Sequence, residues 1–109
     1  MKQDRIYINH ICECIDDIER YVGLNKALFM IDDLVRNACL RQLQIMSESC
    51  TRLSPELRQS LTMIDWAQIA GFRNILVHEY NGKINFDIVW DVIEHRLPML
   101  KKIMKEIKD

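Results

Sequence analysis

The side chains best suited to chemistry lie within residues 73–80, whose sequence is RNILVHEY. A histidine such as His78 titrates near neutral pH, so it can take the proton of a ribose 2′-hydroxyl and return one to a leaving oxygen. An arginine such as Arg73 can hold a phosphate and stabilise the charge of the transition state, and Asn74 beside it can position that phosphate. These residue types suit RNA cleavage without a metal, with a 2′,3′-cyclic phosphate as the product.

The spacing of these residues on a helix limits how one chain can use them. Asn74 and His78 are one turn apart and share a face, and Arg73 and Tyr80 are two turns apart on nearly one face. Arg73 and His78 lie about 140° apart, so one helix brings them only partly together. Two copies around a two-fold axis would gather two of each into one cleft. By itself the pattern is weak, because an arginine and a histidine on a helix more often form a surface pair or pack structurally.

The composition indicates one domain over residues 1–109, with a sizeable core. The 109 residues are 49% hydrophobic and carry a formal net charge of -1. This balance excludes a strongly basic nucleic-acid footprint over the whole chain, so RNA would have to be bound by a local patch. The best candidate patch is the lysine-rich tail. Its alternative is a solvated helix face with cations near a helix C-terminus. The tail lysines are Lys101, Lys102, Lys105 and Lys108.

Four cysteines, without a recognisable framework, indicate a reducing cytoplasm. The spacing of Cys12, Cys14, Cys39 and Cys50 fits neither a zinc ribbon nor a secreted disulfide scaffold. Asp32-Asp33 is not expected to hold a metal, because adjacent helical positions diverge by about 100°. The sequence predicts no signal peptide, no membrane span and no cofactor.

Helix-forming patterns occupy nearly the whole chain. A first helix is predicted over residues 4–22, ending at Gly23, and its apolar stripe recurs every three or four residues. A long second helix is predicted from about Lys26 or Phe29 to Leu53. Two polar residues on its stripe, Gln42 and Ser49, indicate either a dimer interface or the edge of the stripe. The first stripe is Ile8, Ile11, Ile15, Ile18 and Val22, and the second is Ile31, Leu34, Val35, Ala38, Gln42, Ile45, Met46 and Ser49.

Three further helical regions follow. Ser54-Pro55 should begin a short helix that ends near Thr62. Asp65 and Gln68 form a capping-box pattern for a helix ending near Tyr80. The last region starts near Phe86 and should kink or break briefly at Leu97-Pro98. The helix that begins at Asp65 is expected to turn Ile69, Phe72, Leu76 and Val77 inward. Without strand-like alternation, the expected fold is all-α, an antiparallel bundle of four to five helices.

The sequence of residues 73–80 resembles the signature of the HEPN superfamily (higher eukaryotes and prokaryotes nucleotide-binding domains). Arg73-Asn74, three variable residues, His78 and Tyr80 match the R-x4-H-x-Y form typical of HepT-like toxins. Similar blocks extend over nearly the whole chain. One departure is Ser47 and Ser49, where the family often has glycine and alanine. The other similar positions are Trp66, Ile69, Ala70-Gly71, Glu79, Ile88-Val89-Trp90, Leu97-Pro98, Leu100, Arg41, Leu43, Ile45, Glu48 and Leu53-Ser54.

This resemblance implies a HEPN-like helical bundle and a homodimer with composite sites. It implies a metal-independent endoribonuclease acting as the toxin of a type VII toxin–antitoxin system. The partner would be a minimal nucleotidyltransferase antitoxin that transfers AMP from ATP onto Tyr80. The expected catalytic residues are Arg73, Asn74 and His78, with Glu79 and Glu48 in support.

Three features of the sequence each allow more than one interpretation. Glu48 either orients Arg73 or His78, or forms a surface salt bridge with Arg41 or Arg52. Tyr80 considered alone would only order the following loop. The whole chain has two alternatives to a ribonuclease: a non-catalytic module that binds nucleotide or a partner, and a purely structural helical dimer.

Overall fold

The computed structural model describes residues 2–78 and 84–108, and within them the chain forms α-helices, one π-helical turn and no strand. This bears out the expected all-α bundle. The elements in chain order are α1 (Lys2–Val22), α2 (Lys26–Ile31), α3 (Asp33–Thr51), α4 (Pro55–Ser60), α5 (Trp66–His78), α6 (Phe86–Asp91), the π-helical turn η1 (Val92–Arg96) and α7 (Leu97–Glu106).

Helix α1 follows the predicted stripe. All five stripe residues, from Ile8 to Val22, are at most 5% exposed. The helix ends at Gly23, whose φ of +52° places it in the left-handed region that glycine adopts without steric cost. The Gly23 N–H donates to the Glu19 carbonyl at 2.8 Å, which closes the last turn. Sequence spacing and the stop signal therefore predicted this helix correctly.

The predicted long second helix is wrong in one respect: it is two helices. The chain is extended at Asp32, with φ -91° and ψ 107°, so α2 ends there. The Asp32 carboxylate accepts from the Val35 N–H at 3.1 Å and caps α3. A side chain that satisfies a free N–H stabilises a new helix start, and this outweighs the continuous apolar spacing across the break.

The break also changes which face of α3 enters the core. Ile31 and Leu34 of the predicted stripe are 80% and 83% exposed, whereas Ser49 is buried. Met46 of the predicted stripe is buried as well, but the other buried positions Cys39, Leu43 and Cys50 each lie one residue, or roughly 100°, beyond a predicted position. The error arose because residues on both sides of the break were assigned one helical phase.

A buried carboxylate ties the start of α1 to the start of α4. Asp4 is 4% exposed, and it accepts from the Ser54 N–H and from the Ser54 hydroxyl, each at 2.7 Å. Burial raises the pKa of Asp4, but the hydrogen bonds from Ser54 hold the net pKa below its ordinary value of 3.8. Ser54 in turn accepts from the Leu57 N–H at 3.2 Å, as its predicted capping role requires.

Helix α5 begins where the sequence indicated. The Asp65 carboxylate accepts from the Gln68 N–H at 3.0 Å. Of the four residues predicted to face inward, Leu76 is buried, whereas Ile69, Phe72 and Val77 are only partly so. The predicted end near Tyr80 lies outside the described residues. The helix α4 before it ends at Ser60, two residues earlier than expected.

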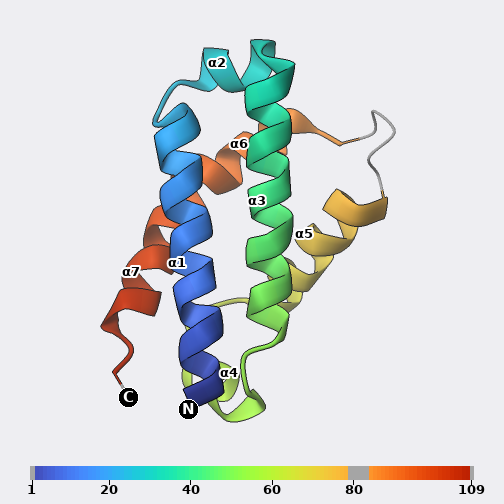
Figure 1. The fold of residues 1–109 in the computed structure, drawn as a ribbon. Helices are drawn as coiled ribbons and strands as arrows, with labels where there is room; N and C mark the ends of the chain where they lie inside the picture. Colours follow the sequence, from blue (N-terminus) through green and yellow to red (C-terminus); the bar gives the residue numbers. More distant parts are fainter. Residues whose placement is uncertain (1, 79–83, 109) are drawn as a thin grey trace.

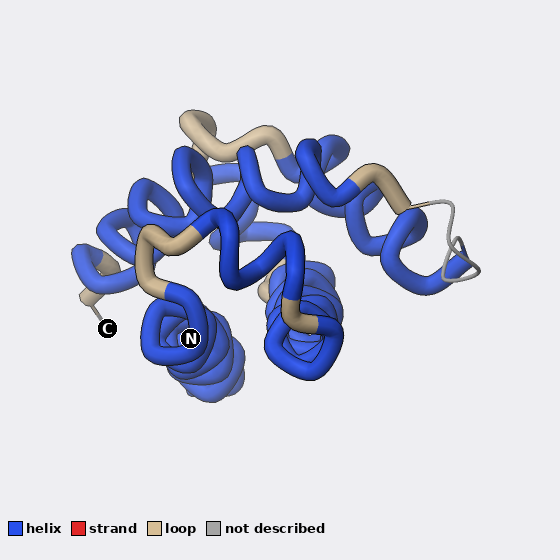
Figure 2. The backbone as a smooth tube through the Cα atoms, turned by 90° about the horizontal axis from the view of Figure 1, so that it is seen from above, coloured by secondary structure: helices blue, strands red, loops and turns tan. Residues whose placement is uncertain are grey.

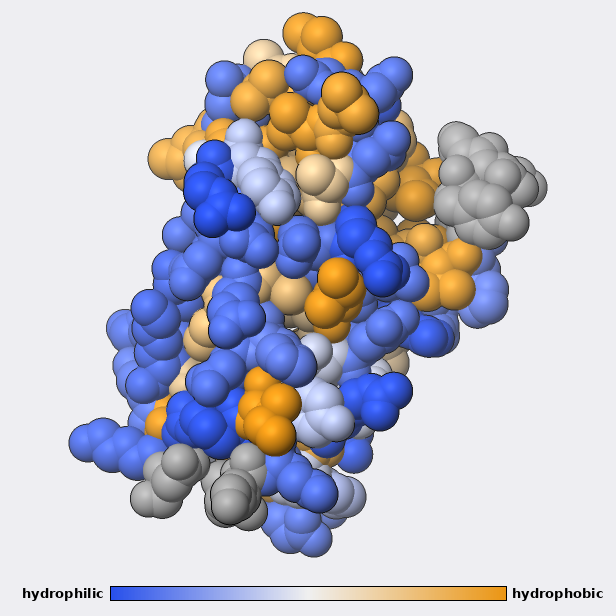
Figure 3. All heavy atoms as spheres, viewed as in Figure 1, coloured by the Kyte–Doolittle hydropathy of each residue, from blue (hydrophilic) through white to orange (hydrophobic). Residues whose placement is uncertain are grey.

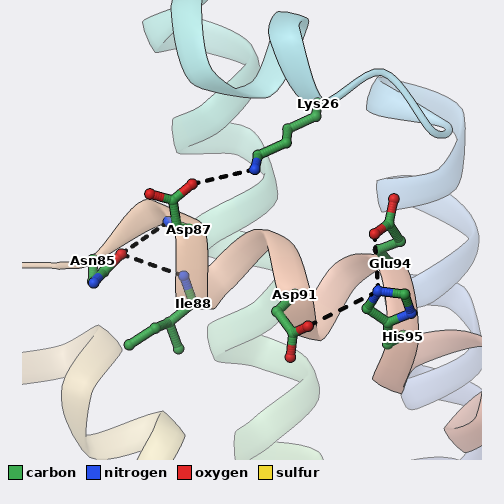
Figure 4. A network of polar contacts seen from close by, with 7 residues as sticks. All are labelled: Lys26, Asn85, Asp87, Ile88, Asp91, Glu94 and His95. Atoms are coloured by element: carbon green, nitrogen blue, oxygen red, sulfur yellow. Dashed lines mark hydrogen bonds and ion pairs between the residues drawn. The ribbon is translucent and has the colours of Figure 1, made fainter.

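The last helical region is irregular close to the predicted place, but Leu97 stays helical, with φ -64° and ψ -41°, so there is no break. Pro98 has no N–H, and its ring clashes with the carbonyl four residues earlier. The preceding turn, η1, widens to π-helical geometry, and the Leu97 N–H donates to the Val92 carbonyl. Asn85 caps α6 by accepting from the Asp87 and Ile88 N–H groups (Figure 4).

The helices form two layers. Helices α1 and α3 lie side by side, and α2 joins them at one end (Figure 1). Viewed from above, the two helices are seen nearly end-on, and most of the remaining chain forms a second row on one side of them (Figure 2). Phe29 of α2 is fully buried, with its ring centroid 5.5 Å from that of Trp90 and 6.3 Å from that of Phe86. α7 packs against α1, whereas α5 packs against α3.

Candidate active site

Helix α5 carries the candidate residues along the outer side of α3. Arg73 and Asn74 lie in its middle, and His78 is its last residue. The helix packs against α3, and its C-terminal half extends away from the rest of the bundle (Figure 1). The site is therefore open to solvent on one side and supported by α3 on the other.

Arg73 makes contacts with two of the predicted site residues. Its Nη2 lies 3.7 Å from Oε1 of Glu48 on α3, and its Nη1 donates to Oδ1 of Asn74 at 3.4 Å. Glu48 Oε1 also accepts from Gln44 Nε2 at 3.3 Å. The side chains of Arg73 and Glu48 are 36% and 40% exposed, so a phosphate can reach the guanidinium. The structure thus places Glu48 beside Arg73. Among the described residues, Glu48 makes no hydrogen bond or ion pair with Arg41 or Arg52.

His78 stands apart from this group. It is exposed at the end of α5, and it makes no hydrogen bond or ion pair with any residue in the described ranges. The expected separation of about 140° from Arg73 around the helix axis applies, since both residues lie within α5. Glu79 and Tyr80 lie outside the described residues. One chain therefore supplies an arginine and a histidine that do not converge.

The other two histidines have ordinary surroundings. His95 Nε2 lies 2.9 Å from Glu94 Oε1 and 4.0 Å from Asp91 Oδ1, in a surface cluster (Figure 4). The exposed His10 packs edge-on against Tyr7, with ring centroids 6.1 Å apart. Neither approaches the Arg73 cluster in any described contact.

The four cysteines are free thiols, and three of them belong to the core. Cys14, Cys39 and Cys50 are each at most 5% exposed, and Cys12 is half-buried. Burial raises the pKa of Cys14 and Cys39 to about 11 and that of Cys50 to about 12. Thiols with such pKa values remain protonated at neutral pH and act as small apolar side chains rather than nucleophiles.

The lysine-rich tail lies on the opposite side of the bundle from Arg73. Lys101 forms ion pairs with Asp16 and Glu19 of α1, which neutralise its charge. Since α7 packs against α1 and α5 against α3, this patch does not extend the Arg73 cluster (Figure 1).

The described residues contain neither a cluster of metal-ligating side chains nor a membrane-spanning helix. They include no group of three or more His, Cys, Asp or Glu side chains placed to hold a metal ion. None of the helices in residues 2–78 and 84–108 is long and apolar enough to span a membrane. Asp32 caps α3, and Asp33 pairs with Arg36, so both carboxylates have structural roles.

An open apolar groove of about 470 Å³ separates α5 from the segment α6–η1–α7. Ile75 lines it from α5, about 160° around the axis from Arg73 and about 60° from His78. Arg96 donates to Gln68 Oε1 at 2.7 Å across it. The exposed apolar residues that line this groove are Met63, Ile75, Ile88 and Met99. A second apolar surface lies over α2, at the top of Figure 3, where Leu24, Ile31 and Leu34 are at least 80% exposed.

Gln44 was not identified from the sequence. Gln44 lies four residues before Glu48 on α3 and contacts it. The link from this pair to Arg73 depends on the packing of α5 against α3. The polar sequence Arg41-Gln42-Leu43-Gln44 was the only available signal.

The comparisons with known proteins point to one family. The family model described as "Ribonuclease HepT-like" matches residues 11–107. Over 108 residues the chain is 39% identical to a Caldanaerobacter subterraneus protein named "Putative RNase", covering 98% of this chain and 96% of that protein. Over 113 residues it is 33% identical to a Methanocaldococcus jannaschii protein named "Gamma-glutamylcyclotransferase and putative RNase", covering 98% of this chain and 50% of that protein.

A more distant relative carries the family name. The chain is 24% identical over 103 residues to a Thermococcus cleftensis protein named "Probable ribonuclease HepT", covering 94% of this chain and 93% of that protein. No solved structure matches the chain. With a helical bundle, an Arg-Asn-x3-His segment on α5 and a match over residues 11–107, the chain belongs to the HepT-like ribonuclease family of the HEPN superfamily.

Proposed function

We propose that this chain is a metal-independent endoribonuclease, the toxin of a type VII toxin–antitoxin pair. The observation that carries the proposal is the Arg73, Asn74 and His78 set on one exposed helix, with Arg73 supported by Glu48. Membership of the HepT-like family and the names of its relatives support RNA as the substrate.

The reaction needs no group beyond the RNA and these side chains. His78 removes the proton of a ribose 2′-hydroxyl, and the 2′-oxygen attacks the adjacent phosphorus. The bond from phosphorus to the 5′-oxygen of the next nucleotide breaks, and that oxygen receives a proton from a histidine. Arg73 binds the phosphoryl oxygens as charge develops on them, and Asn74 fixes their position. The products are a 2′,3′-cyclic phosphate and a free 5′-hydroxyl, and DNA is inert because it lacks the 2′-hydroxyl.

We further propose that two copies complete the site. Within one chain Arg73 lies beside α3, whereas His78 lies nearer the groove on the other side of α5. In a two-fold dimer whose interface includes the exposed face of α5 between Arg73 and His78, the Arg73 of each copy would lie near the His78 of the other. The exposed apolar residues of the groove support the pairing, because monomeric proteins rarely expose large contiguous apolar surface.

The proposed antitoxin is a nucleotidyltransferase that modifies Tyr80. The phenol oxygen would attack the α-phosphorus of ATP, and pyrophosphate would leave. The attached nucleotide would bring bulk and negative charge near Arg73, which would exclude an RNA phosphate.

The first test is a growth and RNA-integrity assay. We expect wild-type protein to arrest growth and to cleave purified RNA in EDTA, leaving 2′,3′-cyclic phosphate ends. His78→Ala should lower cleavage at least about a hundredfold, because it removes the acid and base. His10→Ala is the matched control, since His10 is an exposed histidine on α1, and it should retain full activity. A folded wild-type protein that binds RNA without cleaving it would replace the ribonuclease with a binding module.

The same assay tests the regulation. Co-production with the neighbouring nucleotidyltransferase should restore growth and add AMP to the toxin, detectable by mass spectrometry. The Tyr80→Phe protein should gain no AMP and should continue to arrest growth. Tyr21→Phe should behave as wild type. Rescue of Tyr80→Phe would move the regulatory site elsewhere.

A further inference from the structure

A smaller cavity lies a short distance along α3 from the Arg73 cluster. It has a volume of about 280 Å³ and opens between α3, the C-terminal half of α5 and the start of α6. One wall is mainly polar and is formed by α3, whereas the facing wall is apolar. The lining residues are Asn37, Leu40, Arg41, Gln44, Leu76, Ile84 and Phe86.

The polar wall is continuous with the candidate active site. Asn37, Arg41 and Gln44 are spaced four and three residues apart, so they share one face of α3. The next residue on that face is Glu48, which accepts from Gln44 at 3.3 Å and lies 3.7 Å from Arg73. Arg41 is seven residues from Glu48, or roughly 10 Å along the helix axis. An RNA strand with a phosphate bound to Arg73 would therefore pass the opening of this cavity.

The lining has the chemistry of a nucleotide site. Arg41 is exposed and has no hydrogen bond or ion pair with any residue of the described ranges, so its charge is available to a phosphate. The amides of Asn37 and Gln44 offer donors and acceptors of the kind that match a base edge. Leu40, Leu76 and Phe86 supply apolar surface for the flat faces of a heterocycle.

The size and stiffness of the cavity suit one base. About 280 Å³ is just below the range of roughly 300–1,000 Å³ typical of sites for drug-sized ligands, so a single heterocycle fits better than a larger molecule. The aromatic wall is held on the protein side, where the Arg36 guanidinium lies 4.4 Å from the Phe86 ring centroid. The Phe29 ring also meets Phe86 edge-on.

We propose that this cavity binds one base of the RNA next to the phosphate held by Arg73. Asn37 and Gln44 contact the base edge, and Arg41 contacts the backbone phosphate of the same nucleotide. The proposal rests on the proposed ribonuclease function and gives that enzyme a base preference at one position beside the cut.

The test measures binding separately from cleavage. Full-length protein carrying His78→Ala is titrated with fluorescein-labelled single-stranded hexamers of A, C, G or U, and Kd is read by anisotropy. We expect one base to be preferred. Asn37→Ala should reduce that preference about tenfold, and the matched Asn9→Ala, an exposed asparagine on α1, should leave it unchanged.

Arg41→Ala should have a different signature. It should weaken the binding of all four hexamers alike. The slope of log association constant against log salt concentration should become shallower by about 0.7, the value for one lost phosphate contact to a single strand. Arg20→Ala removes an exposed arginine from α1 and should leave the slope unchanged.

The outcomes separate this proposal from the ribonuclease proposal. Equal affinity for all four hexamers, or a preference that survives Asn37→Ala in a protein with unchanged circular dichroism, would overturn the base site. If Asn37→Ala removes the preference while wild type cleaves nothing, the base site stands and the ribonuclease falls. If wild type cleaves RNA and Asn37→Ala cleaves at the same sequences, the base site falls alone.

Discussion

At the level of single residues, the contacts of Arg73 determine how it can meet a phosphate. Glu48 lies 3.7 Å from its guanidinium and fixes its direction, but it also neutralises part of its charge. A phosphate and Glu48 therefore compete for the same cation, and both groups are open enough to solvent for water to weaken their attraction. In the proposed enzyme Glu48 would act on RNA only through Arg73, so we expect it to be a positioning residue.

Replacing Glu48 should separate positioning from charge. We expect Glu48→Gln to lower kcat about 10- to 100-fold, because a misplaced arginine stabilises the transition state poorly. KM should stay the same or fall, because a negative charge near the RNA phosphate is removed. Single-turnover and steady-state cleavage of one short RNA would measure both.

Two further variants complete this experiment. Glu48→Asp keeps the charge and should recover part of kcat, and Glu56→Gln, an exposed residue of α4, should change neither constant. A higher KM with unchanged kcat would mean that Glu48 contributes to RNA binding and does not position Arg73.

The candidate site residues were proposed from the sequence, whereas their geometry was not predicted. The helix that carries Arg73 and His78, and its Asp65 cap, followed from local signals. The contact of Glu48 with Arg73 depends on how α5 packs against α3, so the sequence left two readings open. The smaller cavity, lined by Asn37, Arg41 and Gln44, is formed by three separate parts of the chain, and no local sequence pattern indicated it.

At the level of elements, one hydrogen-bonded carboxylate holds together helices that are distant in sequence. Asp4 and Ser54 are 50 residues apart, and their two hydrogen bonds join the start of α1 to the start of α4. Because the pKa of Asp4 is below 3.8 in the folded chain, its ionised form stabilises the fold above that pH. This contribution is lost as the pH falls through the lowered pKa.

Asp4→Asn should therefore destabilise the protein in a pH-dependent way. At pH 7 we expect the free energy of unfolding to fall by about 1.5 kcal/mol, the value of a hydrogen bond to a charged group. The difference from wild type should shrink below pH 4. Urea unfolding followed by circular dichroism between pH 7 and pH 2.5 would measure it.

Asp32→Asn is the matched control for this change. Asparagine caps helices as well as aspartate does, so we expect only a small loss of stability. A constant Asp4→Asn difference at all pH values would show that the carboxylate charge contributes nothing to the fold.

Local signals predicted the elements well where the chain gives a clear start or stop. The stripe of α1, Gly23, the Ser54 cap and the irregularity before Pro98 were all recognisable. The break at Asp32 was missed because the apolar spacing continues across it. The core positions Cys39 and Cys50 were missed with it, since the helical phase was taken from Ile31 and Leu34.

At the level of the whole molecule, the distribution of apolar surface bears on the proposed dimer. The groove beside α5 exposes apolar side chains on the side where His78 lies, while Arg73 faces α3. If the dimer interface also includes the exposed face of α5 between Arg73 and His78, each cleft combines an arginine from one chain with a histidine from the other.

Mixing inactive variants tests this arrangement. Arg73→Ala and His78→Ala proteins, each inactive alone, should recover about a quarter of wild-type activity when refolded together in equal amounts. Half of the resulting dimers are mixed, and each of these has one complete cleft. RNA cleavage at constant total protein is the readout.

A second mixture controls for simple dilution. Wild type refolded with the Arg73→Ala/His78→Ala double variant should retain about a quarter of the activity if clefts are shared between chains, and about half if they are not. No recovery in the first mixture, together with half activity in the second, would place each complete site within one chain.

The three core thiols also make the pairing of α1 with α3 chemically observable. Cys14 lies on α1, and Cys39 and Cys50 lie on α3, all buried and protonated in the closed bundle. A thiol-specific label can reach them only when the helices separate, so its rate of incorporation reports the population of opened molecules. The half-buried Cys12 would label faster and provide an internal standard. The bundle thus contains a native probe of the transient separation of α1 from α3, without any engineered residue.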